Sequence, residues 1–416
     1  MSRAKETFKP RDEREVKIFT CGPSTYRRPH IGNYRTFLYE DVLVRYLTYK
    51  GHKVNRVINF TDVEDKTISE AKDRKRVMKE ITDDVARHFH SECKLLKIML
   101  PDKIPTGATS VEQAAKIIKE LLKKGYAYWD DGDVFFQPLK VKNFGKLYRL
   151  DMSKWPENPV KYRKDTYNGN RWNRGDFVLW HGYRDGDIAS WDTEIGKGRP
   201  SWNIQDPAMI TENLGYQVDI NCGGIDNIYR HHDYNIAIIE SLSGKTYANF
   251  YMHGEHLIVD GKKMSKSHGN ILYPDELIKD EKFKPEHLRF FLTATNHYRK
   301  KLNFTREVCR KRAEVLDQFH AALGSLLSKS SGKRSASPAE KDPEIEKKLR
   351  AEIGSVTSEF ERCMEEDLDV PAAFNAVSGV VKKLAGLTGG KPLSSSLAEE
   401  LESQIKRVDQ VFGVLL

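Results

Sequence analysis

Residues 16–60 read VKIFTCGPSTYRRPHIGNYRTFLYEDVLVRYLTYKGHKVNRVINF. Within them, Val16 to Thr20 form a short apolar run that is typical of a buried strand, and a Cys-Gly-Pro turn follows it. From Tyr34 to Lys50 the apolar residues recur at helical spacing, and Gly51 stands where a helix C-cap is expected. The apolar run from Val54 to Phe60 predicts the next strand. Strand, glycine-containing loop, helix and strand make a βαβ unit, so this stretch predicts an α/β fold with a parallel sheet.

The rest of the chain is organised around this unit. The βαβ pattern returns from Trp202 to His268, and the polar, loop-rich stretch from Lys140 to Arg199 predicts an insertion between two halves of the sheet. A Ser/Lys/Ala/Pro-rich segment, residues 328–343, indicates a flexible linker. Residues 344–416 carry an amphipathic helical pattern, which predicts a small helical bundle.

Composition narrows the classes of protein. The chain has 416 residues, of which 31% are charged, and a formal net charge of +9. This charge fits a polyanionic partner such as RNA, and the alternative is an ordinary basic cytosolic protein. The charged N-terminus, residues 1–17, has no apolar segment of a secretory signal, and no apolar run is long enough to span a membrane. Five widely spaced cysteines do not form a disulfide framework. We therefore expect a cytoplasmic protein.

The first motif with chemical meaning is residues 29–33, PHIGN, in the loop before the first helix. A strand-to-helix turn brings backbone N–H groups and the positive end of the helix to one place, which suits phosphate. The imidazole of His30 can donate a hydrogen bond to a phosphate oxygen, and Gly32 allows close approach of a nucleotide. The alternative is an incidental loop, because four residues alone are a weak signal.

The second motif is residues 263–267, KMSKS, followed by His-Gly-Asn. Two lysines on a short loop, Lys263 and Lys266, can neutralise the charge that develops on a departing pyrophosphate. The alternative is a solvated basic loop, but the hydroxyls of Ser265 and Ser267 and the following glycine argue against it.

These two motifs resemble the HIGH and KMSKS signatures of class I aminoacyl-tRNA synthetases, with Asn33 where the second histidine of HIGH is expected. The chain further resembles cysteinyl-tRNA synthetase. The segments that carry this likeness are residues 21–26 (CGPSTY), 59–66 (NFTDVEDK), 175–180 (GDFVLW) and 198–202 (GRPSW). The likeness extends from about residue 16 to the C-terminus.

The resemblance implies a Rossmann-like class I catalytic domain with a central insertion, followed by an all-α helical bundle. The expected divisions are a catalytic domain over residues 1–300 with the insertion at about 100–200, a stem-contact helical region over 301–327, the linker over 328–343 and the bundle over 344–416. The family usually continues into a small anticodon-binding domain, which we expect this sequence to lack because it stops at Leu416.

The resemblance also implies that the protein binds ATP with Mg2+ and that His30, Asn33, Lys263 and Lys266 act on the phosphates. Residues 222–226, CGGID, resemble the GGGSD of the family, so Gly223 and Gly224 would pack under the adenosine and Asp226 would accept hydrogen bonds from the ribose. The remaining ATP contacts would be Gly32, Leu257, Ile258, Ser265 and Ser267, and Thr61 and Trp202 would line the amino-acid pocket.

The zinc site of cysteinyl-tRNA synthetases is only half present. Cys21 and His231 match two of its four ligands, whereas Asp206 stands for the second cysteine and Asn235 for the glutamate. Asn203 and Asn221 likewise replace histidines of that pocket. Replacing a thiolate by a harder carboxylate, and a carboxylate by a neutral amide, should lower the affinity for zinc. We leave open whether the Cys/Asp/His set still holds Zn2+ or whether these are ordinary pocket residues.

Three functions fit this pattern. The first is formation of an aminoacyl-adenylate and transfer to tRNA, with cysteine as the amino acid that the resemblance implies. The second is a paralogue that activates another amino acid and transfers it to a small amine or a carrier, which the altered zinc ligands favour. The third is a non-catalytic RNA-binding relic, and the two largely intact signature loops argue against it.

Overall fold

The structure is a computed structural model that describes residues 2–165, 172–328 and 342–416. The chain divides into two compact units, and each is described by itself. The first consists of residues 1–29, 52–91 and 99–253, and the second of residues 30–51, 92–98 and 254–416.

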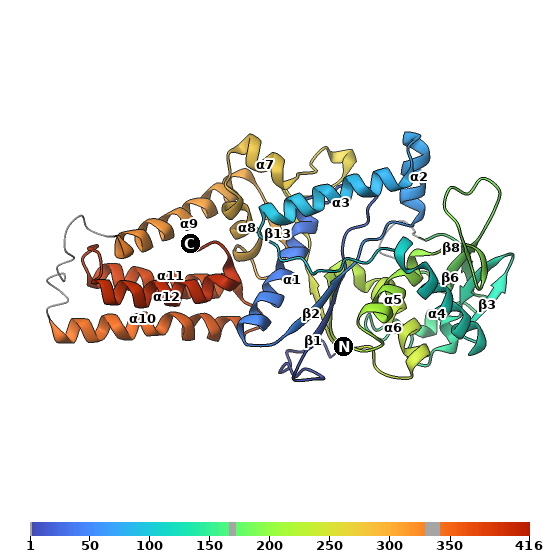
Figure 1. Ribbon diagram of the computed structural model, residues 1–416, viewed down its shortest axis with the longest axis horizontal. Helices are drawn as coiled ribbons and strands as arrows, with labels where there is room; N and C mark the ends of the chain where they lie inside the picture. Colours follow the sequence, from blue (N-terminus) through green and yellow to red (C-terminus); the bar gives the residue numbers. More distant parts are fainter. Residues whose placement is uncertain (1, 166–171, 329–341) are drawn as a thin grey trace. The chain divides into compact units, whose positions relative to one another are not determined.

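A parallel sheet forms the centre of the first unit. Its strand order is β10 (Ala248–Gly254), β9 (Val218–Gly224), β1 (Val16–Thr20) and β2 (Val54–Ile58). Strand β1 runs parallel to both of its neighbours, with Phe19 opposite Val57 on one side and Asn221 on the other. Strands β1 and β2 lie side by side in Figure 1. The sequence-based prediction of a parallel sheet is therefore confirmed.

Two helices pack on this sheet and start beside its carboxyl edge. Helix α5 (Trp202–Asn213) supplies Ile210 and helix α6 (His231–Ser243) supplies Ile236 to a buried cluster that includes Phe19 of β1. Helix α4 (Val111–Lys123) shares a second buried cluster with both. The other helices that begin in this unit are α2 (Asp65–Arg74) and α3 (Met78–Leu95).

The polar stretch of the sequence folds largely into a second sheet of the first unit. Its strand order is β3 (Ala127–Asp130), β4 (Asp133–Phe136), β6 (Gly175–Gly182), β8 (Gly196–Pro200) and β7 (Trp191–Thr193), with β5 (Val160–Tyr162) beside β6. Asp131 and Gly132 join β3 to β4 with φ values of 52° and 77°, a turn in which both central residues are left-handed.

The second unit is mainly helical. It contains α1 (Ile31–Tyr49), a small sheet of order β12 (Lys262–Lys263), β11 (Leu257–Val259) and β13 (Leu302–Phe304), and the helices α7 (Pro274–Glu281), α8 (Pro285–Ala294) and α9 (Arg306–Leu327). The bundle predicted at the end of the chain is formed by α10 (Pro343–Met364), α11 (Val370–Leu387) and α12 (Ser395–Phe412), which lie side by side in Figure 1.

A buried ion pair ties α1 to α8 within this unit. The Arg289 guanidinium donates to Asp41 Oδ2 at 2.7 Å and to the Phe412 carbonyl at 2.8 Å. Both charged side chains are almost completely buried, so each depends on the other for its counter-charge. In the part of the chain that the structure describes, none of the helices has the length and apolar character that crossing a lipid bilayer would need.

Candidate active site

The phosphate-binding motif predicted at residues 29–33 forms the N-terminus of α1. The helix begins at Ile31 and not at Tyr34, because His30 is its N-cap. His30 Nδ1 accepts a hydrogen bond from the Gly32 N–H at 3.2 Å, and Asn33 Oδ1 accepts one from the His30 N–H at 3.0 Å. These two hydrogen bonds provide acceptors for backbone N–H groups at the helix start, which have no acceptor within the helix. The hydrogen bond from Gly32 also means that a neutral His30 ring carries its proton on Nε2.

The lysine loop lies next to this helix start within the second unit. The Ile31 N–H donates to the Leu272 carbonyl at 3.0 Å, which joins α1 to the segment after the loop. A Cβ atom added to Gly32 would lie 2.7 Å from Met264 Cε, so the Met264 side chain of the loop lies against the helix start. The two signature motifs therefore come together in one unit, as the sequence predicts.

A residue that the sequence analysis assigned no role holds the loop in shape. Asn270 Oδ1 accepts from the Ser265 N–H at 3.0 Å, and its amide donates to the Lys263 carbonyl at 3.3 Å. The Ser265 and Ser267 hydroxyls lie 3.1 Å apart. The sequence signal for Asn270 was its position shortly after the KMSKS stretch, behind His268 and Gly269. Lys263 is exposed at the end of β12, and the side chain of Lys266 lies outside the described residues.

The predicted adenosine contacts fall in both units. Leu257 and Ile258 are in β11, where Ile258 is opposite Lys263 in the antiparallel register. Gly223 and Gly224 end β9 in the first unit, and Asp226 follows in a short 3-10 helix with its carboxylate exposed. An exposed carboxylate just beyond the carboxyl end of a parallel strand is suited to bind a ribose diol.

The predicted amino-acid pocket is a buried polar cluster in the first unit, with Asp206 at its centre. Asp206 Oδ2 lies 2.8 Å from His231 Nε2 and accepts a hydrogen bond from Asn235 Nδ2 at 3.3 Å. Asp206 Oδ1 accepts from Asn59 Nδ2 at 2.8 Å. Cys21 Sγ lies 3.8 Å from Asp206 Oδ2. The structure therefore brings together all four positions that correspond to the zinc ligands of the family.

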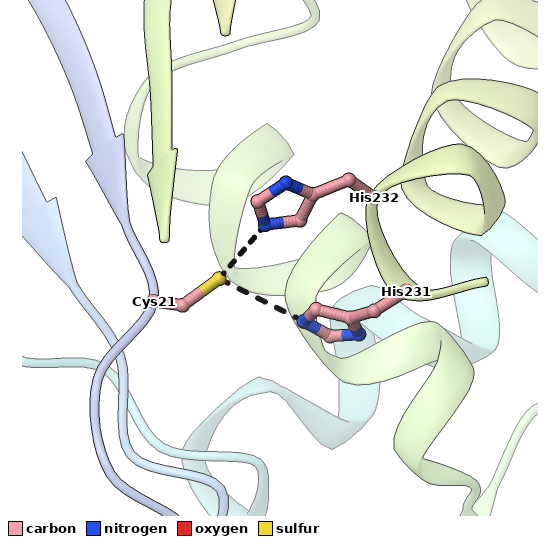
Figure 2. Close-up of side chains that lie close together, drawn as sticks. All are labelled: Cys21, His231 and His232. Carbon is pink, nitrogen blue, oxygen red and sulfur yellow. Dashed lines mark hydrogen bonds between the residues drawn. The ribbon is translucent and has the colours of Figure 1, made fainter. Parts of the chain in front are cut away.

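A further histidine, His232, reaches the same cluster. Its Nε2 atom lies 3.2 Å from Cys21 Sγ, closer than the 3.7 Å to His231 Nε2, and both rings point toward the sulfur in Figure 2. The other ring nitrogen, Nδ1, lies 2.8 Å from His253 Nε2. His232 is not among the site residues predicted from the sequence. The pair of adjacent histidines at the start of α6 was the only sequence signal for it.

Burial lowers the pKa of His232 and of His253. Burial, with smaller effects from His253 and His231, holds the pKa of His232 well below its ordinary value of 6.5. Burial likewise lowers the pKa of His253 to about 3. Neutral imidazoles have a lone pair for a thiol proton or a metal ion.

The two other predicted pocket residues border the cluster. The Trp202 ring stacks on the His231 ring with a centroid distance of 4.3 Å and an interplanar angle of 11°. Thr61 is buried and its N–H donates to the Pro23 carbonyl at 3.2 Å, in the loop that begins with Cys21.

The two asparagines that stand in place of family histidines have different hydrogen-bond partners. Asn203 Nδ2 donates to the Val178 carbonyl at 3.0 Å, whereas Asn221 Nδ2 lies 3.2 Å from His232 Nδ1.

A buried ion-pair network that was not predicted from the sequence supports the start of α5 beside Trp202. Asp165 Oδ1 accepts from the Trp202 N–H at 3.0 Å, and Arg199 donates to Asp165 at 2.9 Å and to Asp65 at 2.6 Å. Burial raises the pKa of Asp165, but the hydrogen bond from His181 and the charges of His181 and Arg199 outweigh it and hold that pKa well below the ordinary value. The guanidinium already serves as the counter-charge, so this network is structural.

Comparison with known proteins agrees with this geometry. The family model of the class I (C) tRNA synthetase catalytic domain matches residues 7–314. The cysteine--tRNA ligase of Chlamydia pneumoniae is 36% identical over 424 residues, which cover 100% of this chain and 85% of the relative. That of Brachyspira hyodysenteriae is 34% identical over 416 residues, covering 99% and 85%.

Solved structures support the fold. Mycobacterium tuberculosis methionyl-tRNA synthetase, in complex with methionyl-adenylate, superposes with a TM-score of 0.69 over 97% of this chain and 90% of that chain. Its sequence identity is 15%, so this likeness concerns the fold alone. The expected class I α/β catalytic fold, with a helical C-terminal region, is confirmed.

Proposed function

Since the chain belongs to the class I tRNA synthetases, within the cysteine--tRNA ligase family, we propose that it is a ligase that activates cysteine with ATP and transfers it to tRNA. The observation that carries this proposal is the close approach of the His30 turn to the lysine loop in one unit. A helix N-terminus and a lysine-bearing loop that lie next to each other suit a triphosphate.

The first step forms the adenylate. A carboxylate oxygen of the amino acid attacks the α-phosphorus of ATP, the bond to the bridging oxygen of the β-phosphate breaks, and pyrophosphate leaves. The Nε2–H of His30 and the ammonium groups of Lys263 and Lys266 stabilise the charge on the phosphates, and Mg2+ accompanies the nucleotide. Placement and charge supply the acceleration, because phosphoryl chemistry needs little covalent help from a protein.

In the second step a ribose hydroxyl at the 3′ end of tRNA attacks the adenylate carbonyl, and AMP leaves. The net charge of +9 supports a polyanionic acceptor. All five cysteines, which lie in the described part of the chain, are thiols, and this supports a reducing cytoplasm.

The second candidate is a paralogue that activates another amino acid and transfers it to a small amine or carrier. The buried Asp206 carboxylate favours it, because the corresponding residue of the family is a cysteine. A buried carboxylate can pair with a cationic or hydroxylated substrate side chain.

Amino-acid-dependent exchange of pyrophosphate into ATP separates these candidates. With each common amino acid tested singly, we expect exchange with cysteine, and aminoacylation of total tRNA that is sensitive to periodate treatment of the tRNA. Exchange with a different amino acid, or with cysteine but without charging of tRNA, would favour the paralogue. Exchange with none of them contradicts the proposal.

A further inference from the structure

The donor atoms of Cys21, His231 and His232 all lie within 4.8 Å of one another, and Asp206 Oδ2 lies beside the first two of them. From Cys21 Sγ the distances are 3.2 Å to His232 Nε2, 3.7 Å to His231 Nε2 and 3.8 Å to Asp206 Oδ2. In a tetrahedral zinc site with ordinary bond lengths, neighbouring donor atoms are about 3.3 to 3.6 Å apart. The 2.8 Å between His231 Nε2 and Asp206 Oδ2 is a hydrogen-bond distance, and a bound metal ion would replace that hydrogen bond.

His232, and not Asn235, offers the remaining donor atom beside Cys21. Asn235 donates its amide to Asp206 Oδ2 at 3.3 Å, and an amide is a weak ligand for zinc. His232 points toward the sulfur from the neighbouring position of the same helix. Gly223 makes room for its ring, since an added Cβ would lie 3.0 Å from His232 Cε1.

From this geometry we propose that the chain binds one zinc ion through Cys21, Asp206, His231 and His232. Relative to the family, the carboxylate has moved to the position of a thiolate, and an imidazole one residue after His231 replaces the carboxylate of the glutamate. One thiolate, one carboxylate and two neutral imidazoles balance the charge of Zn2+, so the buried site holds no net charge. Zinc commonly binds cysteine sulfur, histidine nitrogen and carboxylate oxygen, so this set of donor atoms suits it.

Two of the proposed ligands make a further hydrogen-bond contact through their second polar atom, as metal ligands usually do. Asn59 donates to the second oxygen of Asp206 at 2.8 Å, and His253 lies 2.8 Å from the second nitrogen of His232. These contacts fix the orientation of both groups toward Cys21. The role of the metal, though not its binding, rests on the proposed function: a zinc ion in the amino-acid pocket favours a thiol over a hydroxyl side chain, because sulfur is the softer ligand.

The test measures metal directly, without ATP or amino acid. The full-length protein is purified, its zinc is quantified by mass spectrometry, and the metal is exchanged for Co2+. We expect one metal per chain and a sulfur-to-cobalt charge-transfer band of one thiolate. His232→Ala should weaken metal binding about 100-fold or more, since even supporting contacts are worth 10- to 100-fold, and Cys21→Ser should abolish the charge-transfer band.

Two matched variants complete the experiment. Asn235→Ala and His88→Ala, which removes an exposed histidine, should retain one metal per chain. Thermal unfolding with Zn2+ and with chelator shows whether each variant folds and whether metal stabilises it. A wild-type protein that takes up neither metal, a His232→Ala variant with wild-type affinity, or loss of metal only in Asn235→Ala overturns the assignment. If the protein binds metal but shows no pyrophosphate exchange, the proposed function is contradicted and the metal site is supported. If it shows exchange but binds no metal, the metal site is contradicted and the proposed function is supported.

Discussion

Asn33 and His30 hold each other at the start of α1. The carboxamide oxygen of Asn33 accepts from the His30 N–H at 3.0 Å, while the His30 ring accepts from the Gly32 N–H at 3.2 Å. The residue that stands in place of the second histidine of the HIGH motif is thus a helix-capping residue, whereas the Gly32 N–H fixes which nitrogen of a neutral His30 ring carries the proton.

Asn33→Ala should therefore lower both stability and activity. Loss of a capping interaction costs about 1 kcal/mol of the free energy of unfolding, and the turn that carries His30 loses one of its two capping hydrogen bonds. Urea unfolding and pyrophosphate exchange measure the two effects. Asn158→Ala, at an exposed asparagine, serves as the control and should change neither. Unchanged stability in Asn33→Ala would contradict the capping role.

Lys263→Ala should reduce pyrophosphate exchange by about 100-fold or more, because removing one charge-stabilising donor typically has an effect of this size. Lys266→Ala should act similarly. The neighbouring lysine of β12, Lys262→Ala, is equally exposed and should retain most of the activity. Equal losses in Lys262→Ala and Lys263→Ala would mean that only the overall charge of the loop matters. Circular dichroism should show the same fold for all three variants.

Glu64 makes stability depend on pH. Burial raises its pKa from 4.5 to about 7, and among the described residues no donor hydrogen-bonds to its Oε1 atom. Because the pKa is raised in the folded state, the stabilising contribution of the protonated acid is present below about pH 4.5 and is lost as the pH rises through 7.

Glu64→Gln removes that dependence. At pH 8 the variant should be more stable than the wild type by up to about 3 kcal/mol, and at pH 5 the difference should be much smaller. Denaturant unfolding at both pH values measures it. Glu157→Gln, at an exposed glutamate, is the control. A gain that is the same at pH 5 and pH 8 would show that Glu64 is not the titrating group.

Gly223→Ala should displace the His232 ring, because the new methyl group would lie 3.0 Å from Cε1 and 3.2 Å from Nε2. Overpacking of this kind costs about 1 to 3 kcal/mol, and the affinity for Co2+ should fall with it. Gly324→Ala is the matched control. Its added methyl would meet no atom within 4 Å in helix α9, so it should be neutral or slightly stabilising. Wild-type metal affinity in Gly223→Ala would indicate that His232 is not a ligand.

Much of the fold follows from local pattern. The strand Val16–Thr20 was predicted with its observed bounds, because a buried strand is an apolar run between turn residues. The first helix was predicted to begin too late. Its cap uses a histidine and an asparagine, and apolar spacing alone does not detect a cap of this kind.

The sequence by itself determined the family, and it showed the place of the two signature motifs and of Asp206 and Asn235, because these are properties of residues at matched positions. Only the tertiary structure decided that His232 joins Cys21, and that Asp65, Asp165, His181 and Arg199 form one network. These groups come from segments far apart in the chain. Their chemistry depends on distances of 3 to 4 Å and on burial, which packing sets and no local sequence pattern encodes.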